Sequence, residues 1–516
     1  MADETFYVTT PIYYPNDVPH IGHAYTSVAV DLVARYHRLR GEDVFFLTGT
    51  DEHGQKLQQS AEAEGKDPQA FVDAMEPRWR EVWERLGISY DDYVRTTEPR
   101  HEKVVGEVLQ RVHDNGRDDI YLGTYEGLYC VACEAYYVEE DLNAEGHCPI
   151  HDRPVEHLAQ ENYFFRLSAY ADRLLEHYEA NPEAVRPGIR RNEVLSLIRG
   201  GLQDFSISRT SFDWGVPLPW DPKHVCYVWF DALTNYLTGA GYGIDPPRFE
   251  RIWPADVHFT AKDILRFHAV YWPAMLMAAG MEPPKAVFSH GYLTVGGAKM
   301  SKTNATGIHP FDLTDHFGVD AYRYYFMREI QFGADGNFSW ESMAERYKAD
   351  LSDGLGNLAS RVLAMLAKNF DGKVPDADDE TAAGSLPGLA ADVAARYDAA
   401  MDDIALTRAL EIVWEIVAEA NRYLVEKAPW ALVKQEGGLE EAAKVLYASA
   451  ETLRILALLV SPVMPGAAAR LWEQLGIPEP LSEQRLPEAA RWGGLAPGTQ
   501  TTKGESLFPR LEEKED

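Results

Sequence analysis

The pattern of apolar and polar positions changes along the chain. Up to about residue 115, short apolar runs of strand type alternate with segments in which apolar residues recur every three or four positions. The strand-like runs are Phe6 to Thr10 and Val44 to Thr48, and the helical segments are Ile21 to Leu39 and Pro68 to Leu86. This alternation predicts an α/β domain built on a parallel, doubly wound sheet.

The alternation stops between residues 116 and 220 and then resumes. This stretch holds three cysteines and a tail rich in proline and glycine, which indicates an insertion that splits the sheet. Strand-like and helical segments return at Val225 to Phe230, His258 to Thr260, Ile264 to Met277 and Val287 to His290. We therefore expect a first half of the sheet domain at 1–115, the insertion at 116–220, the second half at 221–300 and a connecting segment at 301–350.

Strand-like runs disappear after about residue 350. Long segments of helical period follow at Leu351 to Leu366, Ile404 to Lys427 and Ala442 to Leu459. They predict an all-α helical bundle that occupies residues 351–516. The charged end of the chain, Gly504 to Asp516, is expected to fray.

The charge balance weighs against a protein that is coated for nucleic acid. The chain has 516 residues with 49 Lys and Arg against 81 Asp and Glu, a formal net charge of −32. A polyanionic partner would therefore need local basic patches. The candidates are Arg186, Arg190, Arg191, Arg199, Arg323 and Arg328. No apolar leader and no run of about 18 apolar residues occurs, which predicts a cytoplasmic protein without a membrane span.

Three of the four cysteines have the spacing of a zinc knuckle. The pattern is Cys130-x2-Cys133-x14-Cys148-x2-His151, in which each pair forms a tight turn that aims two ligands at one tetrahedral ion. Four protein ligands leave no open position, so one structural zinc ion is expected. The alternatives are a disulfide, which a cytosolic chain disfavours, and a remnant without metal. His147 is a possible substitute ligand, and Cys226 is expected in the core.

Two short motifs about 280 residues apart carry the chemistry. His20-Ile21-Gly22-His23 follows a strand-like run and opens a helical segment, which places both imidazoles on one face of a helix N-terminus, a natural site for a phosphate. Gly22 leaves room for a flat group such as a purine. Lys299-Met300-Ser301-Lys302-Thr303 follows Gly296-Gly297, so its lysines are expected on a loop that can close over a triphosphate. Donors fixed on both sides of an α-phosphorus are what in-line phosphoryl chemistry requires.

Together and in this order, the two motifs resemble the signatures HIGH and KMSKS of the class I aminoacyl-tRNA synthetases. The second departs only at Thr303. The resemblance implies a Rossmann-like catalytic domain of HUP type, catalytic roles for His20, His23, Lys299 and Lys302, and ATP binding by these four residues with Gly22 and Ser301. Two other classes stay open: a small nucleotidyltransferase, which has no use for the knuckle or the helical tail, and a silent tRNA-binding relative, which should have lost a motif histidine or lysine.

Over its whole length the chain resembles the methionyl-tRNA synthetase family, in its one-zinc bacterial form. The similar blocks are Thr9 to Tyr14, Thr48 to Gly54, Tyr227 to Leu233 and Lys262 to Trp272. The resemblance implies a methionine site lined by Ile12, Tyr14, Asp51, Trp229, Ala232, Tyr236, Ile264, His268 and Trp272. Leucine, isoleucine, valine or cysteine remains an alternative substrate, although the branched-chain enzymes usually carry a long editing insertion.

Residue chemistry agrees with a thioether substrate. Methionine is long, polarizable and nearly without hydrogen bonds, so its pocket should be aromatic and weakly polar. Trp229 and Tyr236 can build such a pocket with His268 and Trp272, which are one helical turn apart. Asp51, after a strand, can pair with the substrate ammonium. The alternatives are an ordinary aromatic core and an acidic loop residue without a partner.

The family resemblance also implies the partners. It implies ATP with Mg²⁺, L-methionine and both initiator and elongator tRNA(Met), joined through a methionyl-adenylate without a protein nucleophile. Anticodon contacts are implied for Asn357, Arg361 and Trp430, since an amide and a guanidinium can bind base edges and an indole can stack on an unpaired base. The alternative for these residues is helix packing and capping. No appended dimerisation segment is evident, which predicts a monomer.

Overall fold

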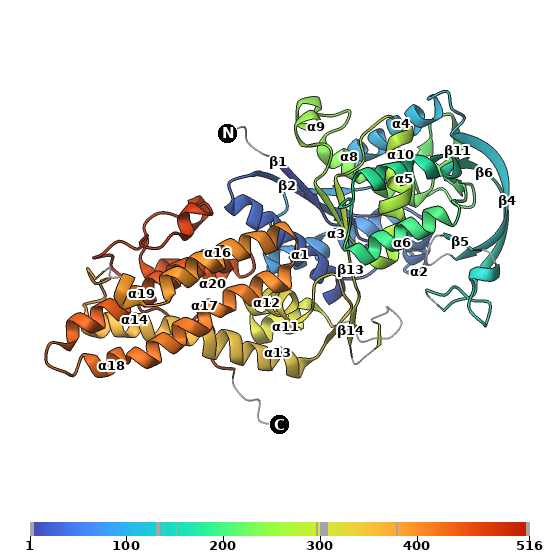
Figure 1. Cartoon of the computed structure of the whole chain (residues 1–516). Helices are drawn as coiled ribbons and strands as arrows, with labels where there is room; N and C mark the ends of the chain where they lie inside the picture. The colour runs from blue at the N-terminus through green and yellow to red at the C-terminus, as the bar shows by residue number, and fades with distance from the viewer. Residues whose placement is uncertain are drawn as a thin grey trace.

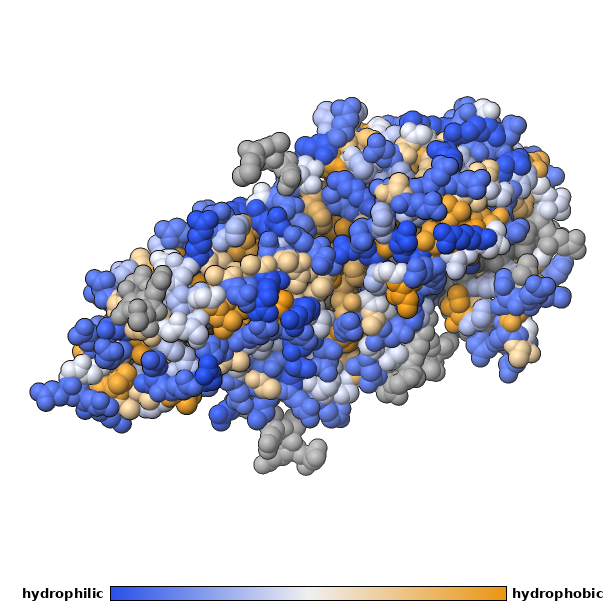
Figure 2. Space-filling model, in the orientation of Figure 1, coloured by the Kyte–Doolittle hydropathy of each residue, from blue (hydrophilic) through white to orange (hydrophobic). Residues whose placement is uncertain are grey.

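The computed structural model describes residues 5–130, 135–137, 139–150, 152–295, 298–299, 308–377 and 380–511. The molecule is elongated, with a sheet-based half that holds the N-terminus and a helical half that extends away from it (Figure 1). No helix in the described ranges combines the length and apolar character that a membrane span needs. The face seen in Figure 2 is mostly hydrophilic, with apolar residues in small scattered patches.

A six-stranded parallel sheet organises the first half. Its strand order is β3-β2-β1-β12-β13-β7, and all five neighbouring pairs run parallel. The bounds are β1 (Thr5–Thr9), β2 (Asp43–Thr50), β3 (Asp92–Arg95), β7 (Val185–Arg186), β12 (Val257–Ala261) and β13 (Ala286–His290). The predicted doubly wound sheet is thereby confirmed, split between early and late strands. Its order reverses between β1 and β12, where ligands bind in open α/β sheets.

Alternate residues of each strand enter two separate cores. Val8 and Phe46 belong to the core on one face, whereas their neighbours Tyr7 and Leu47 belong to the core on the other face. The first face is covered by α1 (Ile21–Leu39) and α3 (Pro68–Leu86), whose bounds are those predicted from periodicity. The second face is covered by α4 (Pro99–His113), α5 (Ala171–Ala180), α6 (Gly188–Arg199), α8 (Asn235–Ala240) and α10 (Trp272–Ala278).

A long antiparallel hairpin leaves the sheet domain within the predicted insertion. It pairs β4 (Ile120–Cys130) with β6 (Glu156–Phe165), flanked by β5 (Ala135–Tyr137) and β8 (Phe205–Ser206), at the far end of the molecule (Figure 1). The segment 116–220 is not wholly separate, because β7 rejoins the central sheet beside β13. The strand expected at Val225 to Phe230 is also wrong in part: β11 (Asp221–Cys226) ends early and α7 (Val228–Leu233) follows.

The second half is helical, as predicted. After β16 (Gly336–Phe338) the described residues form no further strand. The α-helices of this half and its π-helical segment η5 are α11 (Pro310–Phe317), α12 (Val319–Glu329), α13 (Trp340–Arg346), η5 (Tyr347–Gly356), α14 (Asn357–Asn369), α15 (Glu380–Ala383), α16 (Leu386–Asp402), α17 (Leu406–Lys427), α18 (Pro429–Leu432), α19 (Gly438–Val460) and α20 (Pro465–Leu475). The expectation of a frayed end is wrong up to residue 511, because Leu507 and Phe508 are buried against the bundle.

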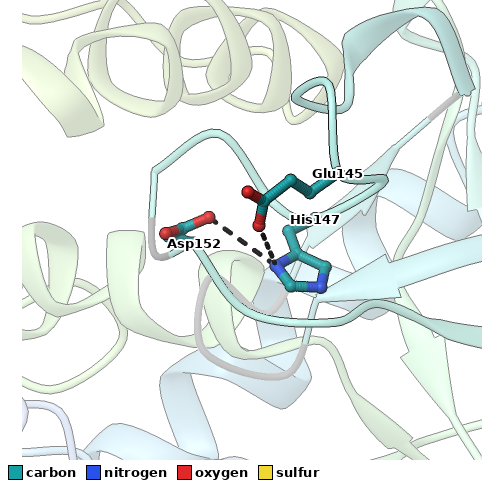
Figure 3. A group of neighbouring side chains, drawn as sticks. All are labelled: Glu145, His147 and Asp152. Carbon is teal, nitrogen blue, oxygen red and sulfur yellow. Dashed lines mark ion pairs between the residues drawn. The ribbon is translucent and has the colours of Figure 1, made fainter.

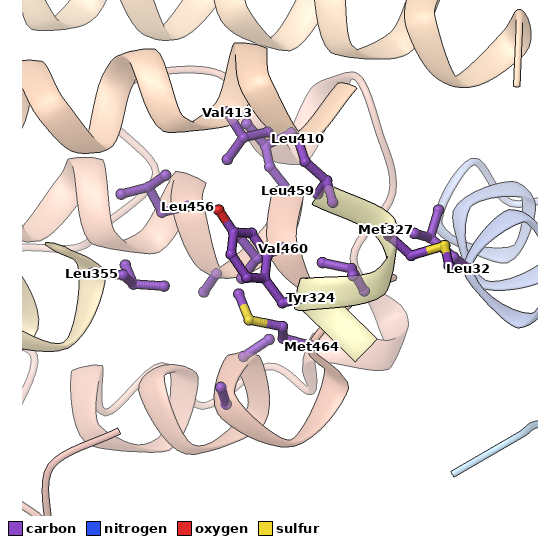
Figure 4. Close-up of a cluster of buried hydrophobic side chains, with 14 of the residues drawn as sticks. Leu32, Tyr324, Met327, Leu355, Leu410, Val413, Leu456, Leu459, Val460 and Met464 are labelled. Atoms are coloured by element: carbon purple, nitrogen blue, oxygen red, sulfur yellow. The ribbon is translucent and has the colours of Figure 1, made fainter. Parts of the chain in front are cut away.

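The two halves share one hydrophobic core. Helix α12 lies between them, and Figure 4 shows Met327 beside Leu32 of α1 and Tyr324 beside Val460 of α19. Because this core runs without a break from the sheet to the bundle, the helical half is fixed to the sheet-based half by buried apolar contacts.

A buried ion pair lies at the same junction. Asp31 of α1 accepts from Arg323 of α12 at 2.6 Å, and both side chains are fully buried. Arg323 also donates to the carbonyls of Leu86, Pro462 and Val463, at 3.1, 3.0 and 2.8 Å. Burial would raise the pKa of the Asp31 carboxyl, but Arg323 and Arg35 lower it below its ordinary value. The proposed basic-patch role of Arg323 is therefore wrong, since no nucleic acid can reach it.

We predict that Arg323→Leu lowers the free energy of unfolding by about 3–5 kcal/mol, because it leaves the Asp31 carboxylate charged and buried. Urea denaturation followed by circular dichroism measures this loss. Arg35→Ala is the matched control: Arg35 also pairs with Asp31, at 2.7 Å, but is partly exposed, and its loss should cost under about 1 kcal/mol. Equal losses in the two variants would contradict the prediction.

Candidate functional site

A cavity of about 350 Å³ opens at the carboxyl ends of β1 and β12. Its walls come from the residues after β1 and β2, the first turns of α1, the α7–α8 segment, the helix after β12 and the residues after β13. The cavity thus lies at the point where the strand order reverses, and its volume suits a small-molecule ligand.

His20 and His23 close the N-terminal end of α1. His20 is the N-cap: its Nδ1 accepts from the backbone N–H of Gly22 at 3.0 Å, and His23 Nδ1 accepts from the N–H of His20 at 3.3 Å. The two rings stack with centroids 3.8 Å apart. Since both Nδ1 atoms accept, the neutral rings carry their protons on Nε2. The N-terminus of a 19-residue helix therefore gains two side-chain donors beside the cavity.

Tyr13 holds this end of the cavity in place. Its ring stacks on Trp79 at 5.3 Å and meets His23 edge-on at 5.3 Å, and its hydroxyl bonds Ser27 at 2.9 Å. Burial raises the pKa of Tyr13, so this hydroxyl stays protonated. The histidine face is thus braced by a rigid aromatic wall.

The opposite wall is largely aromatic, although Asp263 and Arg266 also line the cavity on this side. Trp229 stacks on Phe267 with centroids 3.8 Å apart and an interplanar angle of 4°. His268 donates from Nδ1 to the Ile264 carbonyl at 3.0 Å and accepts on Nε2 from the Tyr236 hydroxyl at 2.8 Å. Burial lowers the pKa of His268 to about 4, so the ring is neutral near pH 7. Ile12, Tyr14, Ala232 and Ile264 complete this wall.

Trp272 does not line the cavity. Its side chain is fully buried and donates from Nε1 to His258 Nε2 at 3.3 Å, while His258 bonds Thr9 at 2.9 Å. The reason is a turn of π-helix, η4 (Phe267–Tyr271), which adds a residue and moves Trp272 off the face that carries His268. Trp272 is therefore not among the residues that line the cavity in this structure, its indole lies behind the wall, and its contact with a ligand stays a prediction.

Asp51 follows β2 directly and lines the cavity at 5% exposure. Its backbone N–H bonds the Tyr13 carbonyl at 2.9 Å, which ties the ends of β1 and β2 together. A carboxylate at the mouth of a mostly uncharged pocket is placed to receive an ammonium group.

A buried network that sequence reasoning assigned no role supports both walls. Asp231, two residues after Trp229, accepts from His53 at 2.7 Å and from His101 at 2.8 Å. His53 is itself two residues after Asp51, and His101 also bonds Thr238 at 2.9 Å. Burial would raise the pKa of Asp231, but the two imidazoles lower it to about 2. The network thus links the Asp51 loop to α7 and α8.

Other cavity residues were also missed. Tyr13, Tyr25, Thr26, Asn235, Asp263 and His290 line the cavity. Some of them, such as Tyr13 and Asp263, lie within the sequence blocks that resemble the family. Nothing in the sequence distinguished them as residues that line the cavity. His290 is neutral like His268: it donates to the Gly291 carbonyl at 2.8 Å and accepts from Thr26 at 2.7 Å, and burial lowers its pKa.

The lysine motif leaves from the rim of this cavity. Leu293, the first residue of β14 (Leu293–Val295), lines the cavity, and the next residue, Thr294, pairs with Lys299 of β15 (Ala298–Lys299). The backbone of Lys299 is thus paired with the residue that follows Leu293, at the rim of the cavity that His20 and His23 also line. Ser301, Lys302 and the glycines before them lie outside the described residues.

Two of the four predicted zinc ligands are described, and they lie in one small buried cluster. Cys130 and Cys148 are 1% and 0% exposed and form no disulfide. Asp152 N–H bonds the Cys148 carbonyl at 2.9 Å, a tight turn of the kind a knuckle needs. Cys133 and His151 lie outside the described residues. Ile150, in the same turn, reaches the cavity rim.

His147, the substitute ligand, turns toward carboxylates. Its Nδ1 lies 3.6 Å from Asp152 and 3.9 Å from Glu145 (Figure 3). This nitrogen is therefore engaged by surface acids, which does not favour the substitution. Cys226 is buried, as expected.

The candidate anticodon residues lie in the helical half, on α14 and α18 (Figure 1). The guanidinium of Arg361 covers the ring of Trp430 at 4.6 Å. Ala428, in a left-handed conformation, ends α17 and lets Pro429 begin α18 at once. Asn357 is exposed at the start of α14, one turn from Arg361.

Most arginines proposed as basic patches are engaged within the chain. Arg190 pairs with Glu193 at 2.8 Å and Arg328 with Glu411 at 3.5 Å. Arg186 and Arg191 donate to backbone carbonyls at 2.6 and 2.9 Å, and Arg199 lies 3.8 Å from Glu179. These patches therefore offer little free positive charge.

We predict that His268 makes stability fall on acidification. Its pKa is about 4 in the folded chain and about 6.5 when unfolded, so between these values only the unfolded chain binds the proton. The free energy of unfolding should drop by up to about 3 kcal/mol from pH 6.5 to 4 and then level off for this group. His268→Gln should lose part of that slope, measured by urea midpoints.

His258 and His290, whose pKa values are also lowered by burial, supply the slope that remains. His316→Gln, on the exposed side of α11 (Pro310–Phe317), is the control and should keep the full slope. A His268→Gln profile parallel to the unmodified protein would refute the assignment.

Comparison with known proteins gives one consistent result. Two protein-family models match: tRNA synthetases class I (M) over residues 6–156 and 144–363, and the anticodon binding domain of methionyl tRNA ligase over residues 374–516. The methionine–tRNA ligase of Streptomyces coelicolor is 51% identical, covering 99% of this chain and 97% of the relative. That of Mesorhizobium japonicum is 49% identical, covering 100% and 99%.

Solved structures agree. Mycobacterium tuberculosis methionyl-tRNA synthetase in complex with methionyl-adenylate superposes with a TM-score of 0.93 at 44% identity, covering 98% of this chain and all of that one. The apo form of the same protein gives a TM-score of 0.85 at 41% identity, covering 99% of each chain. Family models that together span nearly all of the described residues, and full-length relatives near 50% identity, place this chain in the methionyl-tRNA synthetase family of class I aminoacyl-tRNA synthetases.

Proposed function

We propose that this chain is a methionine–tRNA ligase, which activates L-methionine with ATP and transfers it to the 3′ end of tRNA(Met). One observation carries the proposal: a single cavity joins two helix-end imidazole donors to a largely aromatic pocket. The end with the imidazole donors suits the phosphates of ATP, and the aromatic end suits the thioether of methionine. The methionine carboxylate and the α-phosphorus would therefore meet between these two ends.

In the activation step we assign the phosphates of ATP to the α1 end. The Nε2–H groups of His20 and His23 would stabilise charge that grows at the α-phosphorus as the methionine carboxylate attacks, and pyrophosphate leaves. Gly22 would admit the adenosine, and Lys299, Ser301 and Lys302 would close over the phosphates. ATP would arrive with Mg²⁺, as this class of ligase generally requires.

Methionine is assigned to the aromatic wall. Its thioether would lie among Trp229, Tyr236 and His268, of which Tyr236 and His268 are already hydrogen-bonded to each other and His268 to the Ile264 carbonyl. Such a wall costs a thioether nothing, whereas a charged side chain would be desolvated without a partner. The substrate ammonium would pair with Asp51.

Transfer to tRNA would follow at the same site, while the anticodon of the tRNA would be bound far from this site, in the helical half. A hydroxyl of the terminal adenosine attacks the activated carbonyl of methionyl-adenylate, the bond to phosphate breaks and AMP leaves, so no protein nucleophile is required. Arg361 and Trp430 form a ready stacked platform, beside which Asn357 can bind base edges. We further propose that the chain acts as a cytoplasmic monomer, with the insertion, catalytic and anticodon regions divided near residues 116, 221, 301 and 351.

We also propose one structural zinc ion held by Cys130, Cys133, Cys148 and His151. The support is that the buried Cys130 and Cys148 lie in one cluster and that a tight turn follows Cys148. A tetrahedral site with four protein ligands has no open position, so the ion would brace the tip of the hairpin and not take part in the reaction.

Amino-acid-dependent exchange of pyrophosphate into ATP tests the function. We expect a signal with methionine and none above background with leucine, isoleucine or valine. His23→Asn should reduce methionine-dependent exchange by about 10²–10³-fold, because it removes one donor to the transition state. His316→Asn, on the surface of α11, is the control. Exchange with another amino acid but not with methionine would sink the proposal.

Metal analysis of the purified protein tests the zinc site. We expect about one zinc per chain, lost in Cys130→Ser with Cys148→Ser and retained in the control Cys226→Ser. The double variant should also lose thermal stability of the hairpin region, read by proteolysis, since its buried cluster loses its cross-link. Wild-type protein without zinc would refute the site.

A further inference from the structure

The last described residues of the chain are fixed against the start of α14. Leu507 and Phe508 are each 4% exposed. Tyr347 donates its hydroxyl to the Pro509 carbonyl at 2.6 Å, and Arg470 donates to the Leu507 carbonyl at 3.3 Å. These contacts hold the backbone on both sides of Phe508. Arg510, the next residue, is therefore presented at a defined place, with its side chain exposed.

A hollow of about 340 Å³ lies between this segment and the helix that carries Asn357. Ser352, Asp353, Asn357 and Ser360 line one side, and Ser506 and Arg510 line the other. Asn357 begins α14 directly after the π-helical segment η5, a local irregularity that often accompanies a functional position. The proposed anticodon residue Asn357 and the arginine of the terminal segment thus share one recess.

Most arginines of the helical half are paired with a carboxylate, but Arg510 in this recess is not. The paired arginines lie within 4 Å of a carboxylate: Arg328, Arg346, Arg396, Arg408, Arg422, Arg454, Arg470 and Arg491. Among the described residues from 351 on, Arg361, Arg485 and Arg510 have no carboxylate partner. Arg361 lies one turn after Asn357 on α14, and Arg510 lines the same hollow as Asn357, whereas Arg485 is bonded to the carbonyls of Ser482 and Gln484.

Unpaired cations are informative in a chain with a net charge of −32. A polyanion approaching such a surface is repelled unless positive charge is free where it docks. The acid in the recess does not remove that charge, since Asp353 pairs with Lys348 at 3.5 Å. Arg510 therefore adds a cation to the recess that Asn357 lines, one helical turn from the arginine of the Arg361–Trp430 platform, where it could contact a phosphate of the same RNA loop.

We propose that Arg510 binds a phosphate of the tRNA anticodon loop whose bases contact Asn357, Arg361 and Trp430. The inference rests on the proposed function and extends it to the terminal segment. Arg510 is a binding and positioning residue that takes no part in the reaction. Its role is to add sequence-independent affinity at the point where base recognition occurs.

Aminoacylation by the full-length chain tests the proposal, with tRNA varied at saturating methionine and ATP. Arg510→Ala should lower kcat/KM for tRNA about tenfold, the value of one charged hydrogen bond, chiefly through KM. Methionine-dependent pyrophosphate exchange should stay within about twofold of the unmodified chain. Arg510→Lys should recover most of the loss, and the slope of log(kcat/KM) against log salt should become shallower by about 0.7 in Arg510→Ala. Arg485→Ala is the matched control, since it removes another exposed arginine without a carboxylate partner, and should change neither assay.

Several outcomes would overturn the proposal. One is that Arg510→Ala and Arg485→Ala have the same kcat/KM for tRNA. Another is that Arg510→Ala loses activity without a change in the salt slope and that Arg510→Lys does not recover it, which would indicate a merely structural role. A chain that fails methionine-dependent exchange before any substitution defeats the proposed function instead, so the two failures are separable.

Discussion

The buried contact between Asp31 and Arg323 is the constraint on which the rest of the molecule depends. It fixes helix α1, whose first turn carries His20 and His23, against α12 and the carbonyls at the end of α19. The other end of α1 reaches the bundle directly, since Arg40 pairs with Asp402 of α16 at 2.8 Å. One helix therefore runs from the end of the cavity that holds His20 and His23 to the helical half, and the two proposed binding regions share a common frame.

The cavity separates neutral from charged chemistry by hydrogen-bond pairing. His268 and His290 each donate to a backbone carbonyl and accept from a hydroxyl, so burial keeps them neutral. Asp231 is buried too, but it receives two imidazoles and stays ionised. Histidine thus serves as a neutral wall residue at His268 and His290 and as the partner of a buried carboxylate at His53 and His101. The neighbouring groups decide which role each ring has.

The strongly acidic composition and an RNA partner are compatible if positive charge is confined to a few places. In the helical half most guanidinium groups are neutralised within the chain, and Arg361 and Arg510 are left beside Asn357. Positive charge at such a place on an otherwise acidic chain can favour a docking orientation that brings RNA to this recess.

Local pattern determined much of this protein. The period of apolar positions predicted the bounds of α1 and α3 and the parallel sheet. The two motifs and the similar blocks indicated the family. Each of these signals is local, because it is contained in a short run of consecutive residues. Tertiary structure alone decided the rest. Arg323 is in the core although its sequence suggests a surface cation, a π-turn moved Trp272 behind the wall, β7 of the insertion joined the main sheet, and Leu507 and Phe508 anchored an end that looked frayed. Each of these outcomes depends on partners tens or hundreds of residues away, and no local periodicity records which distant group will supply a hydrogen bond or cover an apolar side chain.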